Sequence, residues 1–191
     1  MRIIAGERRG AQLYAPKGMD TRPTQAMVRE ALFNILQFDL QGAQVLDLFG
    51  GSGALALEAL SRGAATAVLV DSDRAAVDCM RRNLQKLRYE ARCRLLLCDY
   101  QQALRRLGKD GARFDLVFLD PPYRVTDLRP VAQTLRRENL LLPGALLVWE
   151  RAAGEQTGFE APYTLLKRRA YGQTVIDLYR FACADDQEDM P

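Results

Sequence analysis

The chain has 191 residues, 48% of them hydrophobic and 27% charged, which is the composition of one globular domain with its own hydrophobic core. Its formal net charge is +3, and a basic protein is expected either to bind a polyanion or simply to have a solvated basic surface. It contains no histidine, which excludes Ser-His-Asp and Cys-His catalysis and histidine-ligated metals, so any chemistry must use carboxylates, amides, backbone groups, aromatic rings or a cofactor.

The first forty residues predict a small basic extension. Residues 2–6 and 12–15 predict two short strands around a basic turn at residues 7–10. Apolar residues at helical spacing then predict a helix that packs against the edge of a sheet: Val28, Ala31, Leu32, Ile35 and Leu36. The cations of this extension are expected either to face RNA or to be solvated, and both interpretations stay open: Arg8, Arg9, Lys17 and Arg22.

From residue 44 onward, short apolar runs alternate with helical stretches. The apolar runs predict strands at residues 44–49, 66–70, 92–98, 114–119 and 145–150. The stretches between them predict helices at residues 54–62, 73–87, 100–107 and 128–138. This alternation is typical of a doubly wound α/β fold with a mostly parallel sheet. Residues 163–169 and 173–181 predict a closing antiparallel hairpin.

A glycine-rich segment follows the first predicted strand. Gly51, Gly53 and Ala56 fit the G-x-G-x-x-G/A pattern, and Asp71 follows about 20 residues later, where a ribose-binding acid is expected. Glycines allow the backbone to turn sharply and to approach a ligand closely. The segment therefore predicts an adenosine-containing ligand, although a strand-to-helix turn without a ligand is the alternative.

Two further acids narrow the choice of ligand. Asp47, just before the glycines, would repel a pyrophosphate but attract the ammonium group of S-adenosylmethionine; its alternative role is to accept backbone N–H groups. Asp99 ends the third predicted strand and is expected to accept a hydrogen bond from an adenine amino group, to cap the following helix, or to do both. With Asp71 and Asp120, these acids come from four strands of one sheet.

The segment Asp120-Pro121-Pro122-Tyr123 follows a buried strand at residues 114–119. Consecutive prolines stop strand pairing, because they have no backbone N–H and a restricted φ. An acid at the strand's end, a stiff turn and an aromatic ring together predict an active-site corner, with an ordinary strand exit as the alternative.

The remaining features of the sequence concern disorder, cellular compartment, solubility and oligomeric state. The end of the chain, residues 184–191, contains four acids and no base, so it is expected to be disordered, and the rest of the chain carries +7. The four cysteines show no C-x-x-C pairing and no signal peptide precedes them, which predicts a reduced, cytoplasmic setting without a zinc site. The longest uncharged stretch, residues 139–149, is far shorter than the ~20 residues of a membrane span, and we expect a soluble monomer.

The segments DLFGGSG and DPPY resemble those of Rossmann-like class I methyltransferases that use S-adenosylmethionine to modify exocyclic amino groups. RIIAGERRG, RPTQAMVREALFNIL and LDLFGGSGALALEALSRGA resemble, more narrowly, the RsmD family of bacterial guanine-N2 methyltransferases of small-subunit ribosomal RNA. The resemblance covers nearly the whole chain except the acidic tail. Two positions depart from the family pattern: Gly50 replaces an alanine, and Asp71, with Asp73 nearby, replaces a glutamate. We expect Asp71 to reach the ribose.

The resemblance implies a seven-stranded sheet, S-adenosylmethionine as cofactor, and methylation of guanine 966 of 16S ribosomal RNA in the small subunit. It implies an amine-binding corner made of Asp120, Pro121 and Tyr123. The expected cofactor residues are Asp47, Phe49, Gly51, Gly53, Asp71 and Asp99. The expected RNA-binding residues are Arg8, Arg9, Lys17, Arg22 and Pro122.

Four other functions are weighed from the sequence. An adenine-N6 methyltransferase of DNA or a glutamine methyltransferase of protein would use the same corner, but no target-recognition domain is visible for a DNA enzyme. A non-catalytic RNA-binding assembly factor would retain the fold alone. A nicotinamide-dependent oxidoreductase is disfavoured by Asp47 and the D-P-P-Y segment. The predicted organisation is an extension at residues 1–40, a methyltransferase domain at 41–183 and the acidic tail.

Overall fold

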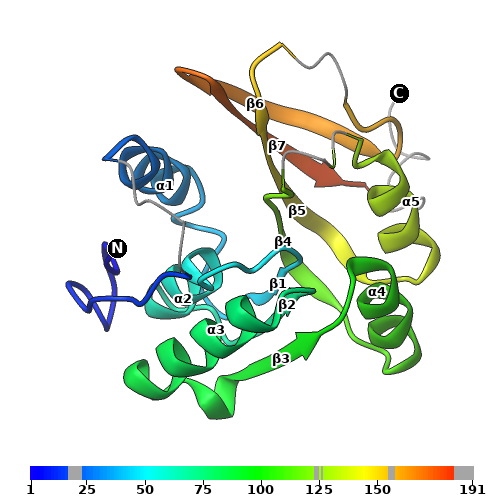
Figure 1. Ribbon diagram of the computed structural model, residues 1–191. Coiled ribbons are helices and arrows are strands. Elements are labelled where there is room, and N and C mark those ends of the chain that lie inside the picture. The colour runs from blue at the N-terminus through cyan, green and yellow to red at the C-terminus, as the bar shows by residue number, and fades with distance from the viewer. Residues whose placement is uncertain (17–22, 123–124, 126, 155–157, 183–191) are drawn as a thin grey trace.

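The protein is built around one seven-stranded β-sheet with the strand order β3-β2-β1-β4-β5-β7-β6 (Figure 1). The computed structural model describes residues 1–16, 23–122, 125, 127–154 and 158–182. The strands are β1 Gln44–Asp47, β2 Thr66–Asp71, β3 Cys93–Leu97, β4 Phe114–Leu119, β5 Leu141–Ala152, β6 Tyr163–Tyr171 and β7 Thr174–Phe181.

The sheet confirms the predicted doubly wound topology. Strands β1 to β5 are parallel to one another, whereas β7 runs antiparallel to both β5 and β6. The chain moves outward from β1 to β3 and then returns to place β4 on the other side of β1. In open α/β sheets, ligands bind at the carboxyl ends of the strands on either side of such a reversal.

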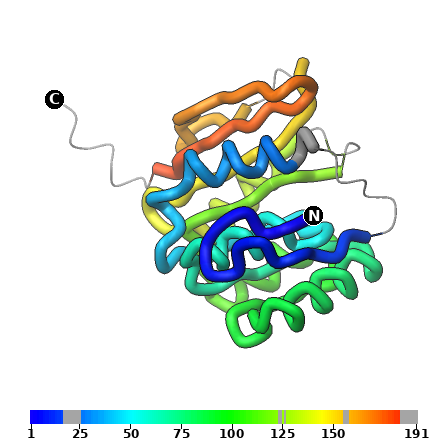
Figure 2. Tube along the Cα trace, turned by 90° about the vertical axis from the view of Figure 1, so that its left-hand side faces the viewer, coloured from blue at the N-terminus to red at the C-terminus, as the bar shows by residue number. Residues whose placement is uncertain are grey.

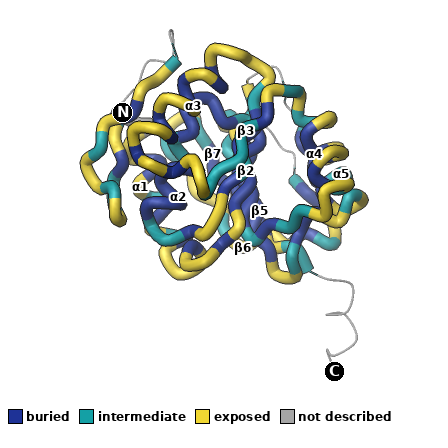
Figure 3. Tube along the Cα trace, turned by 90° about the horizontal axis from the view of Figure 1, so that it is seen from below, coloured by how far each residue is buried: buried dark blue, intermediate teal, exposed yellow. Residues whose placement is uncertain are grey.

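Helices cover both faces of the sheet. They are α1 Pro23–Ile35, α2 Ala54–Ser61, α3 Arg74–Leu87, α4 Tyr100–Lys109 and α5 Arg129–Arg137, with a short 3-10 turn at Glu90–Arg92. Helices α1, α2 and α3 share one apolar core with one face of the sheet, and α4 and α5 share a second core with the other face. Figure 3 shows the buried strands between the exposed outer sides of the helices. Among the described helices, none combines the length and apolar character needed to cross a membrane.

Helix α1 packs across a face of the sheet, so the expectation that it lies against the edge was wrong. Its Phe33 ring contacts the Phe118 ring of β4 with 5.8 Å between centroids. The same core includes Val148 of β5 and Ile176 of β7, and Figure 2 shows α1 running alongside the C-terminal strands. The crossover helices α2 and α3 cover only the β1–β3 half of this face, so the apolar residues of α1 bury the other half.

The first fourteen residues form an arm that lies against α2 and α3 (Figure 2). The two strands expected there are reduced to a single antiparallel bridge between Arg2 and Gln12. The reason is that the backbone N–H groups of Ile4 and Ala5 donate to the Glu58 carboxylate of α2, at 2.7 and 3.0 Å, instead of joining a ladder. The boundary at residue 40 between an extension and the methyltransferase domain stays a prediction.

Candidate active site

Acidic residues gather at the carboxyl ends of the parallel strands. Asp47 ends β1, Asp71 ends β2, and Asp120 directly follows β4. Side chains alternate between the two faces along a strand. The residue two positions before each of these acids lies in the core beneath α1, α2 and α3. All three acids are therefore directed to the same face, where the sheet reverses its strand order.

The glycine loop connects β1 to α2 in a conformation that other residues rarely adopt. Gly51 and Gly53 have φ values of 54° and 79°, and Gly53 is the N-cap of α2 without a side-chain cap. Gly50 has a different reason to be glycine: a Cβ there would lie 2.7 Å from the sulfur of Met80. The Met80 side chain thus occupies space that the family's alanine would need and would have to shift to admit it.

Asp47 is buried and only half satisfied. It is 1% exposed, one carboxylate oxygen accepts a long hydrogen bond of 3.4 Å from the Ala56 N–H, and the other oxygen has no hydrogen-bond partner in the described part of the chain. Burial, followed by the charge of Asp71, raises the pKa of Asp47 to about 7. A buried acceptor without a partner is costly, so this carboxylate suits a ligand that brings a donor or a positive charge.

Asp71 and Asp73 have different surroundings. One Asp71 oxygen accepts from the Gly51 N–H at 2.9 Å and the other from the Asp73 N–H at 2.8 Å, so Asp71 adjoins the glycine loop. Asp73 is the N-cap of α3, where its carboxylate accepts from the Ala75 N–H at 2.8 Å. The position of Asp71 beside the loop favours it over Asp73 as the ribose-binding acid.

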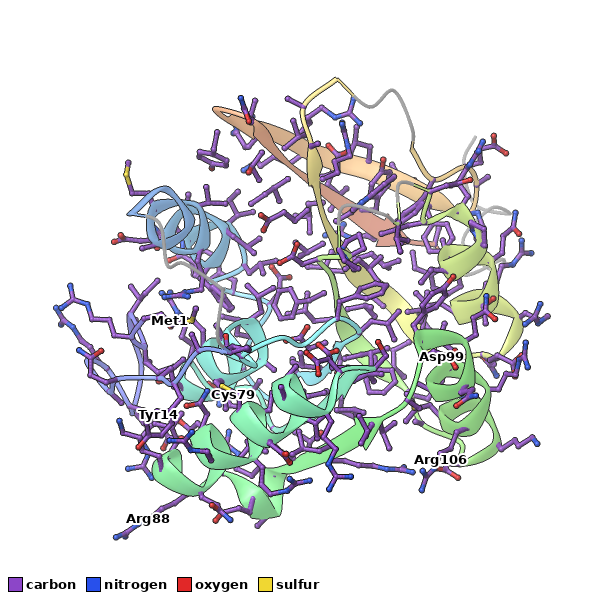
Figure 4. All side chains as sticks on the ribbon, in the orientation of Figure 1. Met1, Tyr14, Cys79, Arg88, Asp99 and Arg106 are labelled. Atoms are coloured by element: carbon purple, nitrogen blue, oxygen red, sulfur yellow. The ribbon has the colours of Figure 1, made fainter. Side chains whose placement is uncertain are left out.

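Asp99 lies one strand further along, at the start of α4. It is the N-cap of that helix, and one of its oxygens accepts from the Gln101 and Gln102 N–H groups at 2.9 and 3.0 Å. Figure 4 shows Asp99 on the α4 side of the sheet, away from Met1 and Tyr14 of the arm. The predicted capping role is confirmed, and the second carboxylate oxygen accepts no hydrogen bond from the described residues. Phe49 lies nearby, with its ring 5.6 Å from that of Tyr100.

The corner after β4 holds an acid that the sequence interpretation missed. Asp120 is accompanied by Glu150 of β5, which is half-buried. Burial and then the charges of Glu150 and Asp47 raise the pKa of Asp120. Asp120 as a whole residue is exposed, so the neighbouring carboxylates are the firmer of these causes. Burial also raises the pKa of Glu150. The signal was present in the sequence, because the apolar run at residues 145–149 ends in an acid as the other strands do.

The proline turn is only partly described. Pro121 is half-buried, Pro122 is exposed, and the Pro122 carbonyl accepts from the Val125 N–H at 2.8 Å. Tyr123 lies outside the described residues, and so do Lys17 and Arg22. Of the predicted RNA-binding cations, Arg9 is exposed, while the Arg8 guanidinium lies over the Tyr89 ring at 5.7 Å.

Asn83, which the sequence interpretation also missed, joins the arm to the glycine loop. This fully buried side chain of α3 accepts from the Tyr14 N–H at 2.8 Å and donates to the Tyr14 carbonyl at 3.0 Å. It also donates to the Ser52 carbonyl in the loop at 2.9 Å. The arm and the loop therefore share one buried amide, a link that no periodicity in the sequence indicates.

The tyrosine of this arm has two cations above its ring. The Arg82 guanidinium lies 4.0 Å and the Lys86 ammonium 4.9 Å from the centroid of the exposed Tyr14 ring. Both cations belong to α3, so the arm and this helix present one basic surface. The described residues contain no group of three or more acids and cysteines that could hold a metal ion, and Cys79, Cys93 and Cys98 are free thiols.

The sequence matches a known protein family. Residues 1–180 match the family described as Conserved hypothetical protein 95. Ribosomal RNA small subunit methyltransferase D of Escherichia coli K12 is 37% identical over 183 residues, covering 94% of this chain and 89% of that protein. The protein of the same name from Haemophilus influenzae is 32% identical over 180 residues, covering 94% and 93%.

A solved structure gives the same result for the fold. The structure of yhhF from Escherichia coli has a TM-score of 0.84 and 33% sequence identity, and the match covers 95% of this chain and 98% of that one. The fold is thus the Rossmann-like α/β fold expected of a class I methyltransferase. Because both the family match and these relatives span most of the sequence, the chain belongs to the RsmD family.

Proposed function

We propose that this protein is an enzyme that uses S-adenosylmethionine to methylate the exocyclic N2 amine of a guanine in 16S ribosomal RNA, with guanine 966 as the expected target. The observation that supports the reaction is the group of carboxylates beside the glycine loop, which has no cationic partner among the described residues. The printed name of the relatives at 32 to 37% identity supports small-subunit ribosomal RNA as the substrate.

The residues at the loop fit the cofactor. The partnerless oxygen of Asp47 suits the ammonium of the methionyl group, and Asp71 beside Gly51 suits the ribose hydroxyls. The free oxygen of Asp99 suits the adenine amine, with the Phe49 ring as an apolar neighbour. When bound, S-adenosylmethionine would supply the methyl group, which its positively charged sulfur would release to the amine nitrogen.

The corner after β4 would prepare the amine. The lone pair of N2 is delocalised into the guanine ring, so the nitrogen is a poor nucleophile until its geometry changes. Two acceptors, the Asp120 carboxylate and the Pro121 carbonyl, would each take one N–H and turn the lone pair out of the ring plane. They would also stabilise the positive charge that develops on nitrogen. The prolines hold the carbonyl in a fixed direction, and Tyr123 would stack on the base.

The reaction needs no strong base, which agrees with the absence of histidine. The nitrogen becomes acidic once it carries the new methyl group, and its proton passes to the Asp120 carboxylate or to water. Burial and the carboxylates nearby raise the pKa of Asp120, which makes it a better proton acceptor than an ordinary aspartate. Much of the remaining acceleration would come from alignment of the reacting atoms.

The target base must leave its stack to reach this corner, which is easiest in a single-stranded loop. The arm and α3 would hold the RNA backbone through the exposed Arg9 and through Arg82 and Lys86 above Tyr14. Contacts of this kind release counterions, so binding should weaken as salt rises.

The direct test uses small ribosomal subunits from cells that lack the activity. They are incubated with the purified protein and methyl-labelled S-adenosylmethionine, the RNA is digested, and the labelled nucleoside is identified. N2-methylguanosine supports the proposal. Label on adenosine or on protein would retain the amine corner but reject guanine. Cofactor binding without any label would favour the non-catalytic assembly factor.

A further inference from the structure

Glu150 lies beside Asp120 on the neighbouring strand. In the parallel pairing of β4 with β5, Leu119 is opposite Trp149, so the next residue on each strand is one of the two acids. On its other side, Glu150 is opposite Ile176 of β7. The carboxylate is thus placed in the middle of the sheet rather than at its lateral edge.

Both acids belong to the same face of the sheet. Val148 and Phe118, two residues before Glu150 and Asp120, lie in the core beneath α1. Ile176, opposite Glu150, lies in that core as well. Because side chains alternate along a strand, Glu150 and Asp120 are directed to the face that also contains Asp47.

Within the described part of the chain, the acids at this corner have no partner of the kind that a buried acid has elsewhere in the sheet. Asp177 of β7 is fully buried, and it accepts from Arg151 at 2.9 Å and from Arg168 at 2.6 Å. In contrast, no described residue makes a hydrogen bond or an ion pair with the carboxylate of Glu150 or of Asp120. One oxygen of the buried Asp47 on the same face is also without a partner. A corner with several acceptors and no donor among the described residues suits a ligand edge made of N–H groups.

We propose that Glu150 determines the specificity for guanine by accepting the N1–H of the target base. This inference rests on the proposed function. Guanine presents three donors on neighbouring atoms, which are the N1–H and the two N2–H groups, with the O6 acceptor on the other side of N1. Asp120 and the Pro121 carbonyl take the two N2–H groups, and Glu150 takes the third. Adenine presents an unprotonated N1, which would face the Glu150 carboxylate as a second acceptor and be repelled.

The test compares guanine with 2-aminopurine at the target position of the RNA. The analogue retains the N2 amine but has an unprotonated N1 and no O6. The wild-type protein should prefer guanine by at least about tenfold in kcat/KM, because a carboxylate opposite N1 rejects the analogue. In Glu150→Gln, the amide can turn an N–H toward N1, so this preference should fall at least about tenfold. The missing O6 affects both proteins alike and cancels in the comparison.

Two controls separate a specific role from a structural one. Glu160→Gln makes the same chemical change at an exposed position and should leave the preference unchanged. Binding of S-adenosylhomocysteine, measured by calorimetry, should be similar in the wild type and in Glu150→Gln.

The outcomes are distinct. If the wild type methylates no guanine, the proposed function fails. If it forms N2-methylguanosine but accepts both bases equally, or if Glu150→Gln keeps the wild-type preference, the role of Glu150 is rejected while the proposed function stands. If the variant does not fold, a wild type that accepts both bases equally still rejects the role of Glu150.

Discussion

Replacing Asp47 with asparagine should stabilise the protein without ligand at alkaline pH while it weakens cofactor binding. The Asp47 carboxyl is almost fully buried, and its pKa rises from 3.8 in the unfolded chain to about 7 in the folded protein. The folded state therefore binds this proton more tightly, and stability is lost as the pH rises from about 4 to about 7. That difference in pKa corresponds to about 4 kcal/mol once the group is fully ionised.

Asparagine does not titrate, so the variant escapes this loss. The relevant quantity is the free energy of unfolding of Asp47→Asn minus that of the wild type. This difference should be about 2 kcal/mol larger near pH 8.5 than near pH 5.5, because the wild type loses that much stability as Asp47 titrates between the two pH values. Constant effects of the substitution, such as altered hydrogen bonds, cancel between the two pH values. The ionised carboxylate at this position thus costs stability, as expected of a group whose proposed role is to bind a ligand.

The assay is urea unfolding of both proteins without ligand at the two pH values. Asp39→Asn makes the same change at an exposed position and reports how the assay itself drifts with pH. The second measurement is calorimetry with S-adenosylhomocysteine near pH 8.5. It should show at least about tenfold weaker binding for Asp47→Asn, because a charge-assisted hydrogen bond is lost. If the stability difference is the same at both pH values, Asp47 does not titrate in this window and the reasoning is wrong.

Three further changes test other parts of the site. Asp120→Ala should lose more than about tenfold in methylation rate, about 1.4 kcal/mol, with unchanged binding of S-adenosylhomocysteine, and a smaller loss would reject the amine-binding role. Asn83→Ala should lower the free energy of unfolding by about 2–4 kcal/mol in urea unfolding, because buried groups of the arm and of Ser52 lose their partner. A loss under about 1 kcal/mol would show that the hydrogen bonds of Asn83 contribute little to stability. Arg8→Ala combined with Arg9→Ala should weaken RNA binding and reduce its salt dependence in a filter-binding titration while cofactor affinity is kept, and unchanged RNA affinity would assign the arm a structural role.

The repeating unit of the fold could be predicted from the sequence because its signals are local. The apolar run at residues 114–119 became β4 with the same bounds. The glycines at positions 51 and 53 adopt the positive φ angles that a sharp turn requires. Acids at the ends of apolar runs also came together as expected, since parallel strands place their carboxyl ends on one side of the sheet.

Three features depended on partners that are distant in the sequence. The arm became a single bridge because the Glu58 carboxylate, more than fifty residues away, accepts its backbone N–H groups. Helix α1 crossed the face over β4 and β5, a choice set by which part of the sheet the other helices leave uncovered. Asn83 joined the arm to the glycine loop through contacts that span 31 and 69 residues.

Glu150 shows most clearly which properties follow from the sequence and which follow from the tertiary structure. Its position at the end of an apolar run is a property of the sequence, as it is for Asp120. That the two acids lie side by side follows from the register of β5 against β4, and the neighbouring cation Arg151 pairs with Asp177 on the other face of the sheet. The sequence by itself determined the elements, the glycine loop and the acids, because periodicity and turn chemistry act over a few residues. Only the tertiary structure decided which charges are neighbours and which are left for a ligand, because strand order and register bring together residues that are far apart along the chain.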